Sequence, residues 1–202
     1  MESPLNCLST KDKITNVTMD LIAEEGFQNI TIRKIAARAQ VNIAAVNYHF
    51  GSKDAVINEA LKTVTTQLMS TYAILKDPGL DITARLEKFL NNYTEVLFRY
   101  PDIMKHMIDH AIHDSSFKEQ ADYAIFLKTE GVGLLKTAIG QLHPGQREEF
   151  HYVKTLHMLS ALSWPILMGE NMKGMMGIDL QDEALRKLHV QLLLEQICNP
   201  GQ

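Results

Sequence analysis

Apolar residues recur at helical spacing along most of this chain, and no stretch alternates apolar and polar residues as a half-buried strand does. Near the N-terminus the pattern predicts three short helices, over residues 14–22, 31–39 and 41–53. Gln40 and Val41 separate the last two, so the turn is very short and Val41 fills the angle between the helices. Three short helices with such a turn form a helix-turn-helix domain.

The residues at the ends of these predicted helices suit their positions. Thr31 and Asn42 stand where a side-chain oxygen caps the first turn of the second and third helices. Gly26 ends the first helix, where glycine adopts a left-handed conformation at little cost, and Phe27 follows as a hydrophobic contact. Local rules alone therefore predict where these helices begin and end.

The rest of the chain is also predicted to be helical. An apolar stripe from Val56 to Leu68 begins directly after the third helix, with Ser52 as its cap, and ends before the breaker Asp77-Pro78-Gly79. This helix would tie the two parts of the chain together mechanically. Further helices are predicted at residues 81–99, 101–113, 115–141, 145–170 and 180–197.

The predicted fold is all-α, with two domains. Residues 1–53 form the N-terminal three-helix helix-turn-helix domain, and residues 54–202 form a larger C-terminal helical domain. The chain has 202 residues, of which 46% are hydrophobic and 22% charged, so it has enough apolar material for a sizeable core.

Several classes of protein do not fit the composition. There is no basic-then-apolar signal segment and no run near the ~18 apolar residues that cross a bilayer. The only cysteines, Cys7 and Cys198, lie near opposite ends and imply no disulfide framework. We therefore expect a cytoplasmic protein that has no membrane partner.

The distribution of charge favours a nucleic-acid partner more than the total does. The net charge is −4, yet Thr31 to Lys53 contains four cations and no carboxylate. Residues 1–53 carry six cations and five acids, whereas residues 54–202 carry 14 cations and 19 acids. The small positive balance lies in the helix-turn-helix domain, where DNA would bind.

The third helix has the composition of a recognition helix. Ala44 and Ala45 let its backbone approach a groove closely, and Asn47, Tyr48, His49 and Lys53 supply hydrogen-bond donors at its far end. A helix of this kind can enter the major groove while its flanks bind phosphates.

The run Asn-Tyr-His-Phe-Gly-Ser-Lys at residues 47–53, following a helix-turn-helix, resembles the DNA-binding domain of the tetracycline-repressor (TetR) family. The resemblance covers roughly residues 10–60. It implies a homodimeric transcription repressor of bacteria that binds an inverted-repeat operator in double-stranded DNA. It also implies that a small-molecule effector releases the DNA, and that residues 54–202 bind the effector and form the dimer.

The resemblance also implies a role for single residues. Thr31 and Arg33 would meet the phosphate backbone, and Asn42 would cap the recognition helix. The remaining DNA contacts would be Ala44, Ala45 and Asn47 at base edges or sugar, and Tyr48, His49 and Lys53 at phosphates. Three residues depart from the family pattern: Gln40 replaces a frequent glycine, Ala45 a frequent threonine or serine, and Asn47 a frequent tyrosine.

The last two long helices are the predicted dimer interface, because a helix that is apolar nearly all round must be covered on more than one side. Two helices from each copy would make a four-helix interface. The predicted interface residues are Leu156, Leu159, Ile166, Leu185, Leu188 and Leu192. The alternative is a monomer with a well-buried helical hairpin.

An effector site is predicted among methionines and aromatic residues of the second domain. Methionine lines adaptable pockets, and Pro165 inside a helix would kink the axis and open a cavity beside Trp164 and Met168. A largely apolar ligand would suit such a site, although a methionine-rich stripe can equally be plain core. The predicted ligand-binding residues are Met104, Met107, His110, Tyr123, Trp164 and Met168.

His106, His110 and His113 share one face of the helix at residues 101–113, which is compatible with a transition metal. Met107 stands where the zinc-protease pattern requires glutamate, so a row facing solvent or ligand is favoured, and no metal or cofactor is predicted. Two alternatives to a DNA-binding repressor remain: a metal-dependent helical enzyme using this row, and a helical adaptor that has lost DNA binding.

Overall fold

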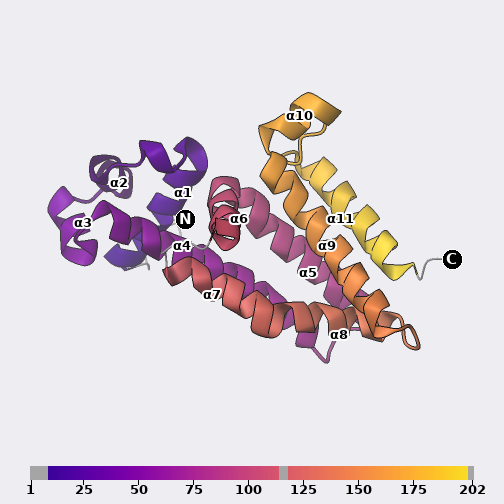
Figure 1. Ribbon diagram of the computed structural model, residues 1–202. Coiled ribbons are helices and arrows are strands. Elements are labelled where there is room, and N and C mark those ends of the chain that lie inside the picture. Colours follow the sequence, from indigo (N-terminus) through magenta and orange to yellow (C-terminus); the bar gives the residue numbers. More distant parts are fainter. Residues whose placement is uncertain (1–8, 114–117, 200–202) are drawn as a thin grey trace, which may run out of the picture.

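The computed structural model describes residues 9–113 and 118–199, apart from the side chains of residues 109–113, 118–121 and 170. Every regular element within these ranges is helical, as predicted (Figure 1). The α-helices are α1 (Thr10–Glu25), α2 (Ile32–Ala39), α3 (Ile43–Phe50), α4 (Lys53–Thr71), α5 (Ile82–Arg99), α6 (Pro101–His113), α7 (Lys118–Phe126), α8 (Val132–Leu142), α9 (Glu148–Met168), α10 (Glu170–Met176) and α11 (Glu183–Cys198). The shorter turns are the 3₁₀ segments η2 (Phe27–Asn29) and η3 (Tyr72–Lys76) and the π-helical segment η4 (Leu127–Gly131).

The first three helices form a head at one end of the molecule, and α4 leads from it into a larger helical body (Figure 1). Ile35, Ala39 and Val46 are buried where α1, α2 and α3 pack together. Helix α4 packs against α1 in the head and against α5 and α7 in the body. The predicted division after residue 53 stays a prediction, because a single hydrophobic core extends through head and body.

The predicted caps are confirmed. The backbone N–H of Lys34 donates to Thr31 Oγ1 over 3.2 Å, and that of Ala45 donates to Asn42 Oδ1 over 2.7 Å. The N–H of Ala55 donates to Ser52 Oγ over 3.2 Å at the start of α4. These bonds satisfy backbone donors that the first helical turn leaves without partners.

The turn between α2 and α3 forces one non-glycine residue into the left-handed region. Gln40 has φ 54° and ψ 44° and is the only such residue in the described part of the chain. Glycine, which is frequent at this position in the family, adopts this conformation at less cost than glutamine does. Gly26 differs from expectation, because its φ is positive at 75° but its ψ of 162° is extended rather than left-handed helical.

The body follows the predicted helices with two differences. The expected helix at residues 115–141 is interrupted by η4, and residues 114–117 lie outside the described range. After α9 ends at Met168, the short helix α10 occupies a stretch that, beyond residue 170, was not predicted to be helical. The remaining helices match the predicted ranges to within a few residues at each end.

Helix α6 lies between the head and the rest of the body (Figure 1). It packs against α1 on one side and against α7 and α9 on the other. None of the helices in the described residues combines the length and apolar character that crossing a membrane requires.

Candidate nucleic-acid interface

Helix α3 has one fully buried side chain, Val46, and presents most of its other side chains outward. Val46 is 1% exposed and packs into the head, whereas Ala44, Asn47, Tyr48 and His49 are exposed. Tyr48 is 86% exposed, which is unusual for a large aromatic side chain in a folded domain. Four of the residues predicted to contact DNA thus share the surface of one short helix.

The aromatic residues at the end of α3 have different roles. Phe50 is half-buried and packs against the core, with the ammonium of Lys11 5.9 Å from its ring centroid. The rings of Tyr48 and His49 meet edge to face, with centroids 5.2 Å apart. Phe50 therefore anchors the helix, while Tyr48 and His49 remain available to a partner.

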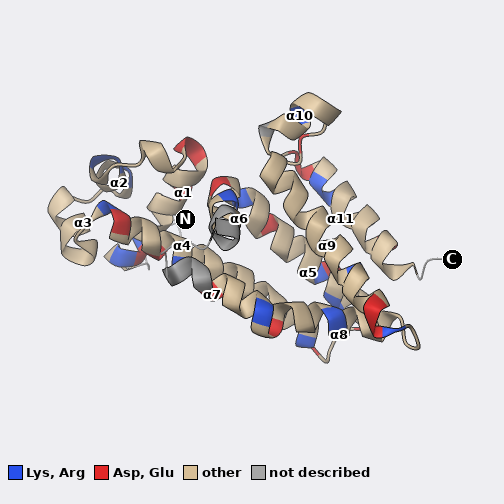
Figure 2. Ribbon diagram, viewed as in Figure 1, with Lys and Arg blue, Asp and Glu red and all other residues tan. Residues whose placement is uncertain are grey.

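Two of the four cations between Thr31 and Lys53 are already paired with carboxylates of α1. Lys34 Nζ bonds Glu25, and Arg38 Nη2 lies 2.6 Å from Glu24 Oε1. Figure 2 shows blue segments on α2 and red on neighbouring α1. Arg33 and Lys53 make no ion pair within the described residues, so the sequence count overstated the positive charge that is free to meet phosphate.

A cavity of about 300 Å³ opens inside the body between α5, α6, α7 and α9. Three of the predicted ligand-binding residues, Met104, Met107 and Tyr123, lie on its wall. Met168 is half-buried against the core and does not line it, and the side chain of His110 lies outside the described residues. The sequence analysis missed Tyr93 of α5, which also lines the cavity.

Trp164 does not belong to this cavity, which corrects the prediction. Its side chain is 55% exposed and lies in a shallow apolar groove of about 360 Å³ between α9 and α11. Leu185, Leu188 and Leu192 line the same groove. Ser163 and Trp164 are neighbours in sequence but lie on different faces of α9. Ser163 lines the cavity, and Trp164 lines the groove.

The predicted dimer residues divide in a similar way. Leu156, Leu185, Leu188 and Leu192 are exposed on the outer face of α9 and α11, two helices that run side by side at one edge of the body (Figure 1). Ile166 is 1% exposed within its own protomer and cannot contact a partner, and half-buried Leu159 lines the cavity. Trp164 shares a groove with Leu188 and Leu192 on this face, and the interface prediction omitted it, whereas exposed Leu167 lines the cavity.

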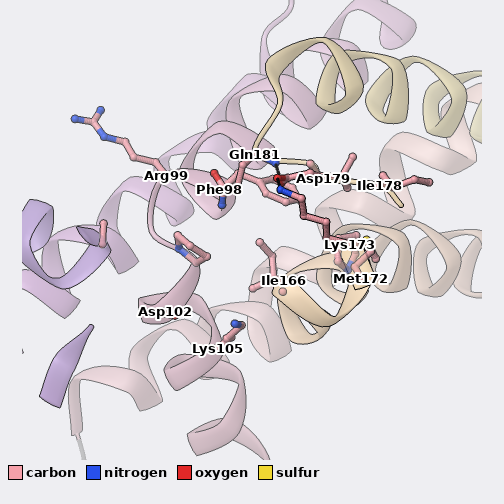
Figure 3. Close-up of a pocket in the computed structure, with 15 residues that line it drawn as sticks. Phe98, Arg99, Asp102, Lys105, Ile166, Met172, Lys173, Ile178, Asp179 and Gln181 are labelled. Atoms are coloured by element: carbon pink, nitrogen blue, oxygen red, sulfur yellow. Dashed lines mark hydrogen bonds and ion pairs between the residues drawn. The ribbon is translucent and has the colours of Figure 1, made fainter. Parts of the chain in front are cut away.

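A second pocket, of about 440 Å³, lies between the head and the body (Figure 3). Ala23 of α1, Asp102 and Lys105 of α6 and the segment Ile178–Gln181 contribute to its wall. Lys173 and Asp179 form an ion pair of 3.1 Å across it, and Arg99 points away from the other lining side chains (Figure 3). Its lining comes from several distant segments, so no sequence pattern indicated it.

Two contacts connect the cavity with the head through α6. The ring of His106 packs against that of Phe27 at a tilt of 41°, with centroids 4.7 Å apart, and joins α6 to the segment after α1. Thr65 Oγ1 of α4 donates to Met107 Sδ over 3.9 Å, and Met107 also lines the cavity. Helix α6, which contributes to the cavity wall, is therefore in contact with both α4 and the head.

The histidine row is only partly described. His106 contacts Phe27, while the side chains of His110 and His113 lie outside the described residues. Among the side chains that are described, no three histidines, cysteines or carboxylates gather as metal ligands would.

Comparison with known proteins agrees with these features. Residues 14–60 match the family described as bacterial regulatory proteins, tetR family. The chain is 27% identical over 105 residues to the HTH-type transcriptional repressor KstR2 of Rhodococcus jostii, covering 48% of this chain and 52% of that protein. It is 21% identical over 180 residues to the HTH-type transcriptional repressor NicS of Pseudomonas putida, covering 88% and 85%. The chain thus matches about half the length of the first relative and most of the second.

Solved structures extend the likeness to the whole fold. A TetR-family transcriptional regulator from Marinobacter aquaeolei superposes with a TM-score of 0.71 at 18% identity, covering 96% of this chain and 93% of the other. A TetR transcriptional regulator from Legionella pneumophila gives 0.68 at 15% identity, covering 95% and 98%. At such identities the likeness shows the fold.

Proposed function

The chain belongs to the TetR family of bacterial regulatory proteins, and from this premise we propose that it is a homodimeric repressor of transcription in the cytoplasm. It binds an inverted-repeat operator and is released by a small, largely apolar effector. Its homologues are transcription regulators rather than enzymes, so the metal-dependent enzyme hypothesis is dropped. The single observation that carries the proposal is α3, a short helix anchored by buried Val46 with exposed Asn47, Tyr48 and His49.

The contacts proposed for DNA follow from this exposure. Ala44, Ala45 and Asn47 face base edges or sugar, and Tyr48, His49, Arg33 and Lys53 meet phosphates. Thr31 and Asn42 hold the starts of α2 and α3 through their caps and approach the backbone there. Phosphate contacts supply most of the affinity, which therefore falls steeply as salt rises.

The outer face of α9 and α11 supports a dimer. Leu156, Leu188 and Leu192 are each about half exposed or more, and Trp164 lies among them. A contiguous apolar face of this kind marks an interaction site. A second copy related by a two-fold axis would cover it with the same face and would match an inverted-repeat operator.

The cavity supports release by an effector. A ligand between α5, α6, α7 and α9 would press on Met107, which is bonded to Thr65 of α4, and on α6, which contacts the head through His106. The effector releases DNA because it binds better to the arrangement in which the two heads do not fit successive major grooves.

Selection of genomic fragments tests the proposal. Purified protein is mixed with sheared DNA from its own source, and the bound fragments are sequenced. We expect enrichment of a short inverted repeat near one promoter. If nothing is enriched, the selection is repeated at low salt. A helical adaptor that has lost DNA binding would show no salt-dependent binding to any duplex, and that result would overturn the proposal.

A further inference from the structure

Three tyrosines meet on the inner side of the body cavity. Tyr72 follows α4 directly, Tyr93 lies on α5 and Tyr123 on α7. The hydroxyl oxygens of Tyr93 and Tyr123 are 2.6 Å apart, and the rings of Tyr72 and Tyr93 meet edge to face at 5.9 Å. Tyr93 and Tyr123 line the cavity, and Tyr72 is buried behind them with 1% exposure.

The backbone behind these rings is shaped to hold them. Gly131 ends the π-helical segment η4, and a Cβ there would lie 3.0 Å from Phe126 Cε1 and 3.3 Å from Tyr72 Cε1. A side chain at this position would crowd the rings, so the absence of one lets η4 pack against Tyr72. Single π-helical turns inside α-helices occur frequently at functional sites.

The three hydroxyls satisfy one another only in part. Within the Tyr93–Tyr123 pair one hydroxyl donates to the other, and the proton of the second is left over. The hydroxyl of Tyr72 has no hydrogen-bond partner among the described residues. Two of the three phenolic protons thus lack an acceptor in a buried setting, where polar groups are ordinarily satisfied.

The surroundings keep these groups neutral. Burial raises the pKa of Tyr72, Tyr93 and Tyr123 above the ordinary value, so all three remain protonated donors near neutral pH. The rest of the described wall is apolar, apart from Ser163, whose hydroxyl already donates to the carbonyl of Leu159 over 2.6 Å. No charged side chain is among the described lining residues, so none of these residues offers an anionic ligand a counter-charge.

We propose that this cavity recognises an uncharged, largely apolar molecule through a hydrogen-bond acceptor oxygen, such as a ketone or ester carbonyl, which accepts the one proton that the Tyr93–Tyr123 hydroxyl pair leaves free. Tyr72 is a positioning residue, because its hydroxyl can donate into the pair and turn the remaining proton toward the cavity. The inference rests on the proposed function only in taking the molecule bound here to be the effector.

The test uses three two-ring probes that share one apolar skeleton. 2-Acetylnaphthalene carries a neutral acceptor oxygen, 2-ethylnaphthalene has none, and 2-naphthoate carries a charge. Equilibrium dialysis against the full chain measures each dissociation constant. We expect the ketone to bind about tenfold more tightly than either other probe, the ratio that one well-made hydrogen bond supplies.

Variants show whether the tyrosines supply that preference. In the double variant Tyr93→Phe/Tyr123→Phe, the ketone should bind no better than the hydrocarbon, while the hydrocarbon's own affinity is retained. The matched control is Tyr152→Phe, which removes a hydroxyl outside the cavity, one that accepts a hydrogen bond from Lys136 Nζ of α8 over 3.2 Å. If the double variant does not fold, the single variants Tyr93→Phe and Tyr123→Phe replace it, and each should reduce the preference.

Several results would overturn the inference: no binding of any probe, equal binding of ketone and hydrocarbon, tightest binding of the naphthoate, or a preference that survives in the double variant. Duplex binding by the same preparations separates this site from the repressor function. Ketone preference without DNA binding would leave the cavity site standing and refute the repressor. DNA binding without ketone preference would support the repressor function and refute the cavity site.

Discussion

The recognition helix in the head and the cavity in the body place their polar groups in opposite ways. Helix α3 is anchored by a single buried residue, Val46, and exposes Asn47, Tyr48 and His49 to solvent. The cavity buries the hydroxyls of Tyr72, Tyr93 and Tyr123 on helices that are far apart in the sequence. In the proposed function, the head meets a charged, hydrated partner at its surface, and the body meets a dehydrated one inside.

This difference sets what a mutation can do in each region. An exposed contact on α3 belongs to one residue, and its loss weakens DNA binding without disturbing the fold. A buried hydroxyl in the body is coupled to its neighbours, so its loss changes stability and ligand preference together. The predictions below test this contrast, beginning with the largest effect.

Replacing Leu188 with Glu should break the dimer and leave the protomer folded. Leu188 is exposed on the outer face of α11, and a carboxylate buried there by a partner would cost about 3–5 kcal/mol as an unpaired charge. Sedimentation equilibrium measures the association. The control Gln146→Glu adds the same charge at the exposed turn before α9. A Leu188 variant that still sediments as a dimer would place the interface elsewhere.

Alkaline pH should destabilise the body through its buried tyrosines. Their pKa is raised on folding, so the folded state keeps protons that the unfolded state releases above the ordinary value of 10.0. Stability is therefore complete below pH 10 and falls as pH rises, by about 1.4 kcal/mol per tyrosine for each pH unit. Urea unfolding at pH 9 and pH 11 measures the loss, and Tyr93→Phe/Tyr123→Phe should show a smaller one. An equal loss in that variant would contradict the assignment.

Replacing Lys53 or Tyr48 with Ala should weaken binding to every duplex alike. Each loses a phosphate contact worth about 1–2 kcal/mol. Arg38→Ala is the informative comparison. Because Arg38 already pairs with Glu24, its replacement should reduce the affinity for DNA by less. Fluorescence anisotropy with the operator and an unrelated duplex gives both affinities. Unchanged binding after Lys53→Ala would show that the proposed placement of α3 and of the start of α4 on DNA is wrong.

The smallest effect is expected at the turn between α2 and α3. Gln40→Gly should stabilise the free protein by about 1 kcal/mol, because glycine adopts the left-handed conformation without the strain of a side chain. Thermal unfolding measures the change. The control Gln146→Gly lies at a residue without positive φ and should not stabilise the protein. Equal stabilisation of both variants would argue against strain at Gln40.

The head was largely predictable from sequence because its determinants are local. Thr31 and Asn42 cap helices through bonds to residues three positions away. The left-handed conformation of Gln40 is likewise set by the short turn in which it lies. The pairing of Arg38 with Glu24 was not predictable, because it depends on how α1 crosses α2. Charge counts along a sequence ignore such pairs, so they overestimate the charge that is free.

The body was predictable as a set of helices but not as a site. A helix that is apolar nearly all round does not reveal which side is covered by its own protomer, so Ile166 was placed on the dimer face although it is buried. Trp164 was assigned to the cavity for the same reason, because only packing decides which face of α9 turns inward. Tyr72 and Tyr93 lay in helical stretches without any local motif, and the tertiary fold alone brings them to Tyr123.

The length of helix α4 determines how far the head would move in the proposed response to the effector. Its first residue, Lys53, is a proposed phosphate contact, and Tyr72 follows its last residue beside the cavity. Its 19 residues make a rod about 28 Å long, so a tilt of ~5° at the tyrosine end would move the other end by ~2.5 Å. In a two-fold dimer the two displacements add to ~5 Å, more than the ~3.4 Å rise of one base pair. A rotation of a few degrees is thus enough to put the second head out of phase with its half of the operator.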